Sequence, residues 1–294
     1  MSLEPGVYPA AVTPFDEKGN VGMAGVAKLL AHFEAGGCKG AVLAGTNGEG
    51  PSLSAPEKRD LIRDAMPLRG RLELVLGIAT SSYDEAIWLC KQAALVEAAA
   101  VLLMPPSYFR DVTDDGLEKW FVRVLDASPS PVLIYNFPQR TGVTLSPDLM
   151  ERLARHDRMV GLKDSSGNRD NLGDYARAAG GSGKRMFVGD ETLLWEALEA
   201  GWTGTISGAA NVLSRWLSAL VRDYHEGRKE SAQAKFQLAL PCIEALRKSP
   251  QPSTNKALLN KRSILPTPNV RAPLGVADPA AVEALEAQLR QALG

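Results

Sequence analysis

Residues 159–167 read Met159-Val160-Gly161-Leu162-Lys163-Asp164-Ser165-Ser166-Gly167, a short apolar run that ends at a lysine and is followed by turn-forming residues. Apolar runs of this length recur along the chain, and each is followed by a longer segment with helical spacing. Near-continuous apolar strands that alternate with amphipathic helices are typical of a parallel sheet covered by helices on both faces. The predicted strands are Val7–Val12, Gly40–Ala44, Leu74–Ile78, Ala100–Leu103, Val132–Tyr135, Met159–Lys163, Met186–Val188 and Gly204–Ser207.

Eight strand–helix units predict an α/β fold that closes into a (β/α)8 TIM barrel, rather than an open doubly wound sheet. Helix starts support this division: Ser54-Ala55-Pro56-Glu57 is a capping box, and Ser146-Pro147-Asp148 has the same logic. Beyond about residue 210, three predicted helices follow without strands between them. We therefore expect a barrel core over residues 1–210, and over 211–294 the last barrel helix and a C-terminal helical extension that does not fold independently. The three helices are Leu213–Glu226, Glu230–Leu246 and Pro279–Leu293.

Composition excludes several classes of protein. The net charge of −1 provides no overall attraction to nucleic acid or to a membrane surface. No basic stretch and apolar core opens the chain, and no apolar segment is long enough to span a bilayer. The three cysteines lack CxxC spacing and predict reduced thiols in a cytoplasmic protein. The three histidines lie far apart, so we expect no metal site.

Lys163 is the first candidate for catalysis, because reactive groups of such barrels lie at the carboxyl ends of the strands. An apolar environment disfavours the ammonium form of a lysine and frees an amine that can attack a carbonyl as a Schiff-base nucleophile. A lone lysine at such a place is more often an ordinary loop residue. The residues at the other strand ends must decide between the two interpretations.

Polar residues follow several of the other strands. The glycine-rich loop 45–50 contains Thr46 and Asn47, and its backbone amides could hold a carboxylate; alternatively it is only a tight turn. Tyr135 offers a phenol that can move a proton, and Arg140 a guanidinium that can grip a carboxylate. Each also has an ordinary structural interpretation, as a packing residue or a solvated cation. Tyr108, after the fourth strand, is a second phenol that could instead serve subunit packing.

The last two strand ends add smaller signals. Gly189, Asp190 and Glu191 follow the seventh strand, where the two acids could bind hydroxyl groups or complement a helix N-terminus. Ile206, Ser207 and Gly208 at the end of the eighth strand predict a small, open rim.

Three of these motifs together resemble the dihydrodipicolinate synthase and N-acetylneuraminate lyase family. They are Gly-Thr-Asn-Gly-Glu at 45–49, Tyr-Asn-Phe-Pro-Gln-Arg-Thr-Gly at 135–142 and Gly-Leu-Lys-Asp-Ser-Ser-Gly at 161–167. The likeness extends from residue 6 to residue 274. It implies a class I, Schiff-base-forming pyruvate aldolase or lyase on a (β/α)8 barrel, without a cofactor and assembled as a homotetramer from two dimers.

The resemblance also implies roles for individual residues. Lys163 would form the imine with pyruvate or another 2-keto acid, and Tyr135 would shuttle protons. Thr46 would bridge Tyr135 to the phenol of Tyr108, which in this family reaches in from a neighbouring subunit. Thr46 and Asn47 would bind the pyruvate carboxylate.

The second substrate stays open between hypotheses. The resemblance of Arg140 to the arginine that grips aspartate semialdehyde favours a 4-hydroxy-tetrahydrodipicolinate synthase type of condensation. Asn47, where such synthases usually have threonine, and the Asp190–Glu191 pair, which is similar to the sugar-hydroxyl ligands of neuraminate lyases, favour a catabolic aldolase. That aldolase would cleave a 2-keto-3-deoxy-sugar acid or 4-hydroxy-2-oxoglutarate. A third hypothesis is a non-catalytic barrel that binds a keto acid, but such a binder would not need Lys163, Tyr135 and Thr46 together.

Overall fold

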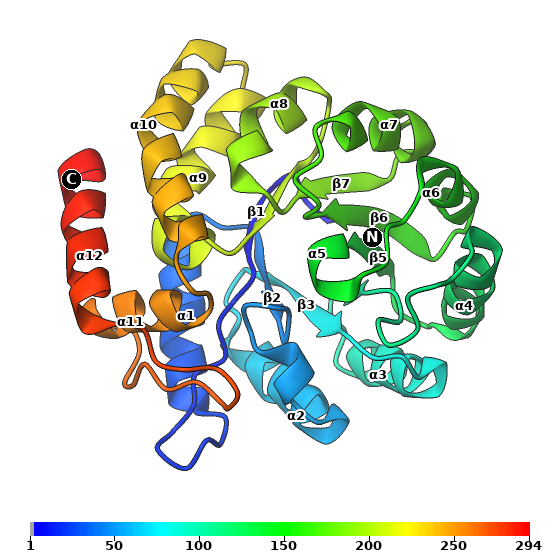
Figure 1. Ribbon diagram of the computed structural model, residues 1–294, viewed down its shortest axis with the longest axis horizontal. Coiled ribbons are helices and arrows are strands. Elements are labelled where there is room, and N and C mark those ends of the chain that lie inside the picture. The colour runs from blue at the N-terminus through cyan, green and yellow to red at the C-terminus, as the bar shows by residue number, and fades with distance from the viewer. Residues whose placement is uncertain (1–2) are drawn as a thin grey trace.

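The computed structural model describes residues 3–294 and shows eight parallel strands surrounded by helices (Figure 1). The strands form one sheet in the order β1-β8-β7-β6-β5-β4-β3-β2. Hydrogen bonds from Lys39 N to Val7 O (3.0 Å) and from Ala11 N to Val42 O (2.9 Å) join β1 to β2 and close the ring. The predicted barrel is confirmed. Its strands are β1 (Gly6–Pro9), β2 (Gly40–Leu43), β3 (Glu73–Ile78), β4 (Ala100–Leu103), β5 (Val132–Asn136), β6 (Met159–Asp164), β7 (Arg185–Val188) and β8 (Gly204–Ser207).

Helices follow each strand and pack around the ring. Ser54 caps α2 with the predicted capping box, since its side chain accepts from Glu57 N (3.3 Å) while the Glu57 carboxylate accepts from Ser54 N (2.9 Å). The hydroxyl of Ser146 likewise accepts from Leu149 N (3.0 Å) at the start of α6. The barrel helices are α1 (Met23–Ala35), α2 (Ala55–Ala65), α3 (Tyr83–Leu95), α4 (Asp114–Ala127), α5 (Pro138–Thr141), α6 (Pro147–Ala154), α7 (Asp170–Ala179), α8 (Leu194–Glu199) and α9 (Ala210–His225).

The first strand is shorter than predicted, for a local reason. The sequence favours a strand over Val7–Val12, but β1 ends at Pro9. The backbone N–H of Val12 donates to the side chain of Asn211 (3.0 Å) instead of to a neighbouring strand. The side chain of Asn211 in turn donates to Ala10 O (2.8 Å), so that α9 binds the segment where the strand would have continued.

Two apolar clusters make up the core. The larger one lies between the strands and the helices. The smaller one fills the inside of the ring, as expected for a barrel whose interior is packed with side chains rather than open. It includes Tyr8, whose ring meets Phe187 edge-on with centroids 5.2 Å apart, and it reaches up to Tyr135. A ligand can therefore enter only at the rim.

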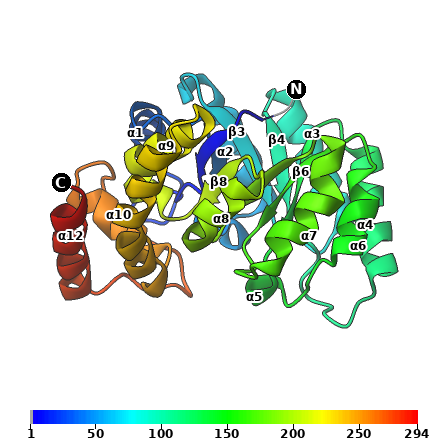
Figure 2. The same cartoon turned by 90° about the horizontal axis from the view of Figure 1, so that it is seen from above.

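The C-terminal extension consists of α10 (Lys229–Lys248), α11 (Ser253–Lys261) and α12 (Pro279–Leu293), which stand beside α9 (Figure 1). Figure 2 shows α10 and α12 together on one flank of the barrel. The sequence pattern predicts α10 and α12 but not α11. The first four residues of α11, Ser253 to Lys256, are buried although they are polar, so the helix lacks the apolar periodicity that predicts one.

A buried ion pair ties the extension to the barrel. Lys256 Nζ on α11 lies 2.5 Å from Glu49 Oε1 in the loop after β2, and neither side chain is exposed to solvent. Lys256 also donates to Asn269 O (2.7 Å) and lies 4.1 Å from the centroid of the Phe15 ring. Burial lowers the pKa of Lys256 to about 8, although Glu49 acts in the opposite direction. That residues 211–294 do not fold independently stays a prediction, and these contacts support it.

The cysteines are free and buried, and burial raises the pKa of Cys38 to about 12 and that of Cys90 to about 11. Across residues 3–294 we find no cluster of His, Cys, Asp or Glu side chains placed to hold a metal ion. No helix in this part of the chain combines the length and the apolar character needed to cross a membrane.

Removing one member of the buried pair should destabilise the fold. In Lys256→Met the carboxylate of Glu49 stays buried without its cation, which we expect to cost about 3 kcal/mol of unfolding free energy. The double variant Lys256→Met/Glu49→Gln should recover most of that loss. Urea denaturation at pH 7 measures both. The matched control is Lys229→Met, which removes an exposed partner of Glu199 and should cost less than about 1 kcal/mol. A loss in Lys256→Met no larger than in the control would contradict the assignment.

Candidate active site

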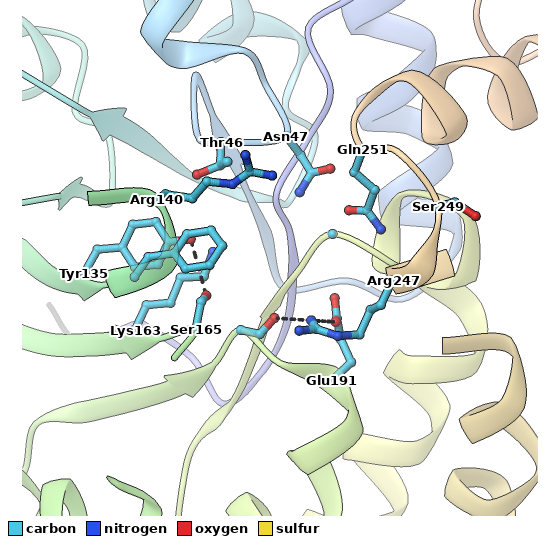
Figure 3. A pocket seen from close by; sticks show the side chains of 13 residues that line it. Thr46, Asn47, Tyr135, Arg140, Lys163, Ser165, Glu191, Arg247, Ser249 and Gln251 are labelled. Carbon is cyan, nitrogen blue, oxygen red and sulfur yellow. Dashed lines mark hydrogen bonds and ion pairs between the residues drawn. The ribbon is translucent and has the colours of Figure 1, made fainter. Parts of the chain in front are cut away.

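A polar pocket opens at the carboxyl ends of the strands, where the barrel rim meets the extension (Figure 3). Loops after five strands contribute to it, and so does the segment between α10 and α11. The lining residues are Thr46, Asn47, Tyr135, Phe137, Arg140, Lys163, Ser165, Gly189, Glu191, Gly208, Arg247, Ser249 and Gln251.

Lys163 and Tyr135 form the inner end of this pocket. They are register partners on β6 and β5, so both side chains point to the inside of the ring. Only 5% of Lys163 and 2% of Tyr135 are exposed, and Lys163 Nζ lies 4.2 Å from the centroid of the Tyr135 ring. We find no ion pair to Lys163 within residues 3–294. The geometry presents a buried amine beside a phenol, with no carboxylate holding the amine.

The next residue pair in the same register faces outward and fixes the strand ends. Asn136 Nδ2 donates to Asp164 Oδ1 (2.7 Å), and the hydroxyl of Ser166 donates to Asp164 Oδ2 (2.7 Å). Burial raises the pKa of the Asp164 carboxyl, while these hydrogen bonds act against that rise. Asn136 also accepts from Leu145 N (3.1 Å). This network holds the backbone on which Tyr135 and Lys163 are carried.

Ser165 and Gly189 complete the surroundings of the amine. The hydroxyl of Ser165 donates to the Tyr135 hydroxyl at 3.3 Å, and the two side chains face each other in Figure 3. Gly189 follows β7 and leaves room for both neighbours. A Cβ at Gly189 would lie 1.9 Å from Ser165 Oγ and 2.8 Å from Lys163 Cε. A side chain at this position would therefore displace the lysine or the serine.

The loop after β2 presents Thr46 and Asn47 from the opposite side of the rim. Its conformation is held by the buried Glu49, which has a left-handed backbone (φ 53°) and accepts hydrogen bonds from Lys256 and from Arg271 N (2.9 Å). Asn255 Nδ2 donates to Asn47 Oδ1 (3.2 Å), which leaves the amide nitrogen of Asn47 as a donor for a ligand. The extension thus orients one of the predicted binding residues.

Two arginines border the pocket on different sides (Figure 3). Arg140 lies on α5 and is exposed, and we find no carboxylate paired with it in the described chain. Arg247 comes from the last turn of α10 and pairs with two carboxylates, Asp190 Oδ2 at 2.7 Å and Glu191 Oε2 at 3.0 Å. The pocket therefore contains one guanidinium that is free to meet an anion and one that is already neutralised.

Most of the residues predicted to form the site line this pocket, and four do not. Asp190 lies just outside the lining, bound to Arg247 and to Thr192. Ile206 and Ser207 are fully buried beneath it, and the hydroxyl of Ser207 donates to Glu191 Oε1 (2.6 Å). Of the predicted rim after β8, Gly208 lines the pocket, whereas Ile206 packs in the barrel interior and Ser207 is held beneath the pocket by Glu191. Tyr108 is 82% exposed and lies away from the pocket of its own chain. The predicted residues in the lining are Lys163, Tyr135, Thr46, Asn47, Arg140, Gly189, Glu191 and Gly208.

Sequence reasoning missed part of the lining. Ser165 directly follows β6 and carried the same signal as Lys163, so it could have been found. Arg247, Ser249 and Gln251 could not, because they lie beyond the last strand in what the pattern predicts to be a helix end and a linker. Nothing in strand–helix alternation indicates that this segment folds back over the rim.

Adding a single methyl group at Gly189 tests the geometry around the amine. We expect Gly189→Ala to displace the Lys163 side chain and to slow the reaction of its amine with a small carbonyl compound by about a hundredfold, since small misplacements of reacting groups have effects of this size. Gly181→Ala is the control, because a Cβ there meets nothing within 4 Å. Borohydride trapping measures the rate of imine formation in each. Equal rates in the two variants would show that Gly189 does not set the position of Lys163.

Comparisons with proteins of similar sequence and structure agree with what the geometry of the site indicates. The 4-hydroxy-tetrahydrodipicolinate synthase of Listeria welshimeri is 34% identical over 270 residues, 91% of this chain and 92% of that protein. The 4-hydroxy-tetrahydrodipicolinate synthase 2 of Streptomyces coelicolor is 32% identical over 284 residues, 96% of this chain and 93% of its own. A crystal structure of the chloride-inhibited dihydrodipicolinate synthase from Acinetobacter baumannii, complexed with pyruvate, superimposes with a TM-score of 0.92 at 28% identity, covering 99% of both chains.

The family profile described as "Dihydrodipicolinate synthetase family" matches residues 4–292, nearly the whole chain. This match confirms the resemblance found in the three strand-end motifs, and with it the prediction of a carbon–carbon lyase on a TIM barrel. The chain belongs to the dihydrodipicolinate synthetase family.

Proposed function

We propose that this protein is a class I aldolase or lyase that forms a Schiff base between Lys163 and pyruvate and joins the resulting enamine to a small aldehyde. The observation that carries the proposal is the buried, unpaired amine of Lys163, 4.2 Å from the centroid of the Tyr135 ring in a pocket open to solvent. The position of this amine at the inner end of the pocket places a nucleophile where it can attack the carbonyl of a small substrate.

The proposed reaction begins with attack of Lys163 Nζ on the keto carbon of pyruvate. The resulting carbinolamine loses water, and its hydroxyl leaves with a proton that Tyr135 donates. The protonated imine withdraws electrons, so a methyl proton can depart and an enamine forms. The enamine carbon then attacks the aldehyde carbonyl, whose oxygen takes up a proton, and hydrolysis of the imine frees Lys163. Cleavage follows the same steps in reverse.

Ser165 and the loop after β2 would support these steps. The hydroxyl of Ser165 donates to the Tyr135 hydroxyl and so orients the phenol toward the amine. Thr46 and the amide of Asn47 would bind the pyruvate carboxylate, which directs its keto carbon to Lys163. In the family pattern Thr46 also links Tyr135 to a Tyr108 phenol supplied by a neighbouring subunit. The exposure of Tyr108 in its own chain supports that arrangement.

We further propose a homotetramer, built as a dimer of dimers, that works in the cytoplasm. Tyr108 and Phe109 support the assembly, because they stand 82% and 71% exposed with their rings edge to face. Exposed aromatic pairs of this kind are typical of subunit contacts. The three buried, unpaired thiols support a reducing compartment.

Two acceptors remain in competition. The names of the relatives and the unpaired guanidinium of Arg140 favour aspartate semialdehyde, as in 4-hydroxy-tetrahydrodipicolinate synthesis. The amide of Asn47 in the pocket lining favours the aldolase alternative, in which a hydroxylated keto acid such as 4-hydroxy-2-oxoglutarate is cleaved to pyruvate.

Turnover by the purified protein decides between them. We expect pyruvate to be consumed together with aspartate semialdehyde, as measured by loss of pyruvate and formation of a cyclic product. Cleavage of 4-hydroxy-2-oxoglutarate to pyruvate, with no condensation, would replace the synthase by the aldolase.

Lys163→Ala should retain the thermal stability of the wild type to within a few degrees and lose activity by at least about a thousandfold. Substantial activity in Lys163→Ala would contradict the whole proposal.

A further inference from the structure

The two acids after β7 differ from hydroxyl-binding carboxylates in one respect: the protein already supplies donors to all four of their oxygens. Asp190 Oδ1 accepts from the backbone and hydroxyl of Thr192 (3.1 and 2.6 Å), and Asp190 Oδ2 accepts from Arg247 (2.7 Å). Glu191 Oε1 accepts from Ser207 Oγ (2.6 Å) and from Ala209 N (3.0 Å). Glu191 Oε2 accepts from Arg247 (3.0 Å). Only Asp190 Oδ2 and Glu191 Oε2 have a second acceptor site left, and a substrate hydroxyl would share each of them with the Arg247 guanidinium.

Arg247 neutralises the negative charge of this acidic pair. Its guanidinium bridges Asp190 and Glu191 and also donates to Gly189 O at 3.4 Å. It is one-third exposed, and it faces the pocket from the side opposite Lys163 and Tyr135 (Figure 3). Without Arg247, the carboxylate of Glu191 in the lining and that of Asp190 just outside it would have no cation between them.

The charge of these side chains decides which aldehydes the pocket admits. An aldehyde that carries a carboxylate would be repelled by Asp190 and Glu191 alone, because closely placed like charges are unfavourable. With Arg247 in place, its guanidinium and that of Arg140 balance the two acids. Arg140 is then free to grip the carboxylate of the incoming aldehyde.

We propose that Arg247 is a specificity-determining residue, which makes the pocket accept a short aldehyde bearing a carboxylate and discriminate against neutral hydroxylated aldehydes. The inference rests on the proposed function and deepens it by assigning the chemical class of the acceptor. Because Arg247 comes from the C-terminal extension, that part of the chain has a role in substrate choice. It also bears on the conflict between Arg140 and the acidic pair, because Arg247 binds the two carboxylate oxygens that other donors leave free for sugar hydroxyls.

The test compares matched aldehydes in Arg247→Met, Arg247→Lys and the wild type. Glyoxylate and glycolaldehyde differ in having a carboxylate or a hydroxymethyl group, and aspartate semialdehyde and glyceraldehyde form a longer pair. For the wild type we expect higher kcat/KM with the acids. In Arg247→Met the acid-to-neutral ratio of kcat/KM should fall by about tenfold or more, and Arg247→Lys should retain part of it. Arg290→Met, which breaks an arginine–glutamate pair on α12, is the control and should leave the ratio unchanged.

Borohydride trapping with pyruvate alone separates failure of this inference from failure of the proposed function. If the wild type forms no imine, the proposed function is wrong. If the imine forms but Arg247→Met loses activity equally with acidic and neutral aldehydes, Arg247 is a structural residue and the inference is overturned. An unchanged ratio, or a wild type that turns over no acidic aldehyde, overturns it as well.

Discussion

The pairing of β5 with β6 from Leu133 to Asn136, inside a closed parallel ring, is the constraint on which the site depends. It sets Tyr135 directly beside Lys163 and directs both inward, while the following pair, Asn136 and Asp164, points outward into a hydrogen-bonded network. A shift of one residue in this register would place Tyr135 beside Leu162 or Asp164 and turn the side chains of the shifted strand to the other face of the sheet. The closure of the ring between β1 and β2 fixes that register around the whole barrel.

The C-terminal extension supplies the part of the pocket that the barrel alone does not provide. Lys256 holds the loop that carries Thr46 and Asn47 through a buried ion pair with Glu49, and Asn255 orients the amide of Asn47. Arg247, Ser249 and Gln251 form the side of the pocket opposite the amine. In the proposed function, the barrel therefore supplies the covalent chemistry, and the extension shapes the space for the second substrate. Such a division explains how one reaction core can serve different acceptors.

Local signals in the sequence predict much of the fold and of the site. Apolar runs predict all eight strands, because buried parallel strands need continuous apolar segments, and strand ends predict Lys163, Tyr135, Thr46 and Arg140. Contacts that depend on tertiary packing could not be predicted in this way. Helix α11 is not predicted because its buried face is polar. The polar side chains of this face bind partners that are distant in sequence, as Lys256 binds Glu49. Ile206 is misplaced because a strand end does not reveal which face its side chain takes.

The most direct test of the central claim is to reduce the protein with borohydride in the presence of pyruvate and to map the modified peptide by mass spectrometry. The account predicts one adduct, on Lys163 in the peptide that follows Arg158, formed only when pyruvate is present. An adduct on another lysine, such as Lys184 or Lys256, or no adduct at all, would contradict it.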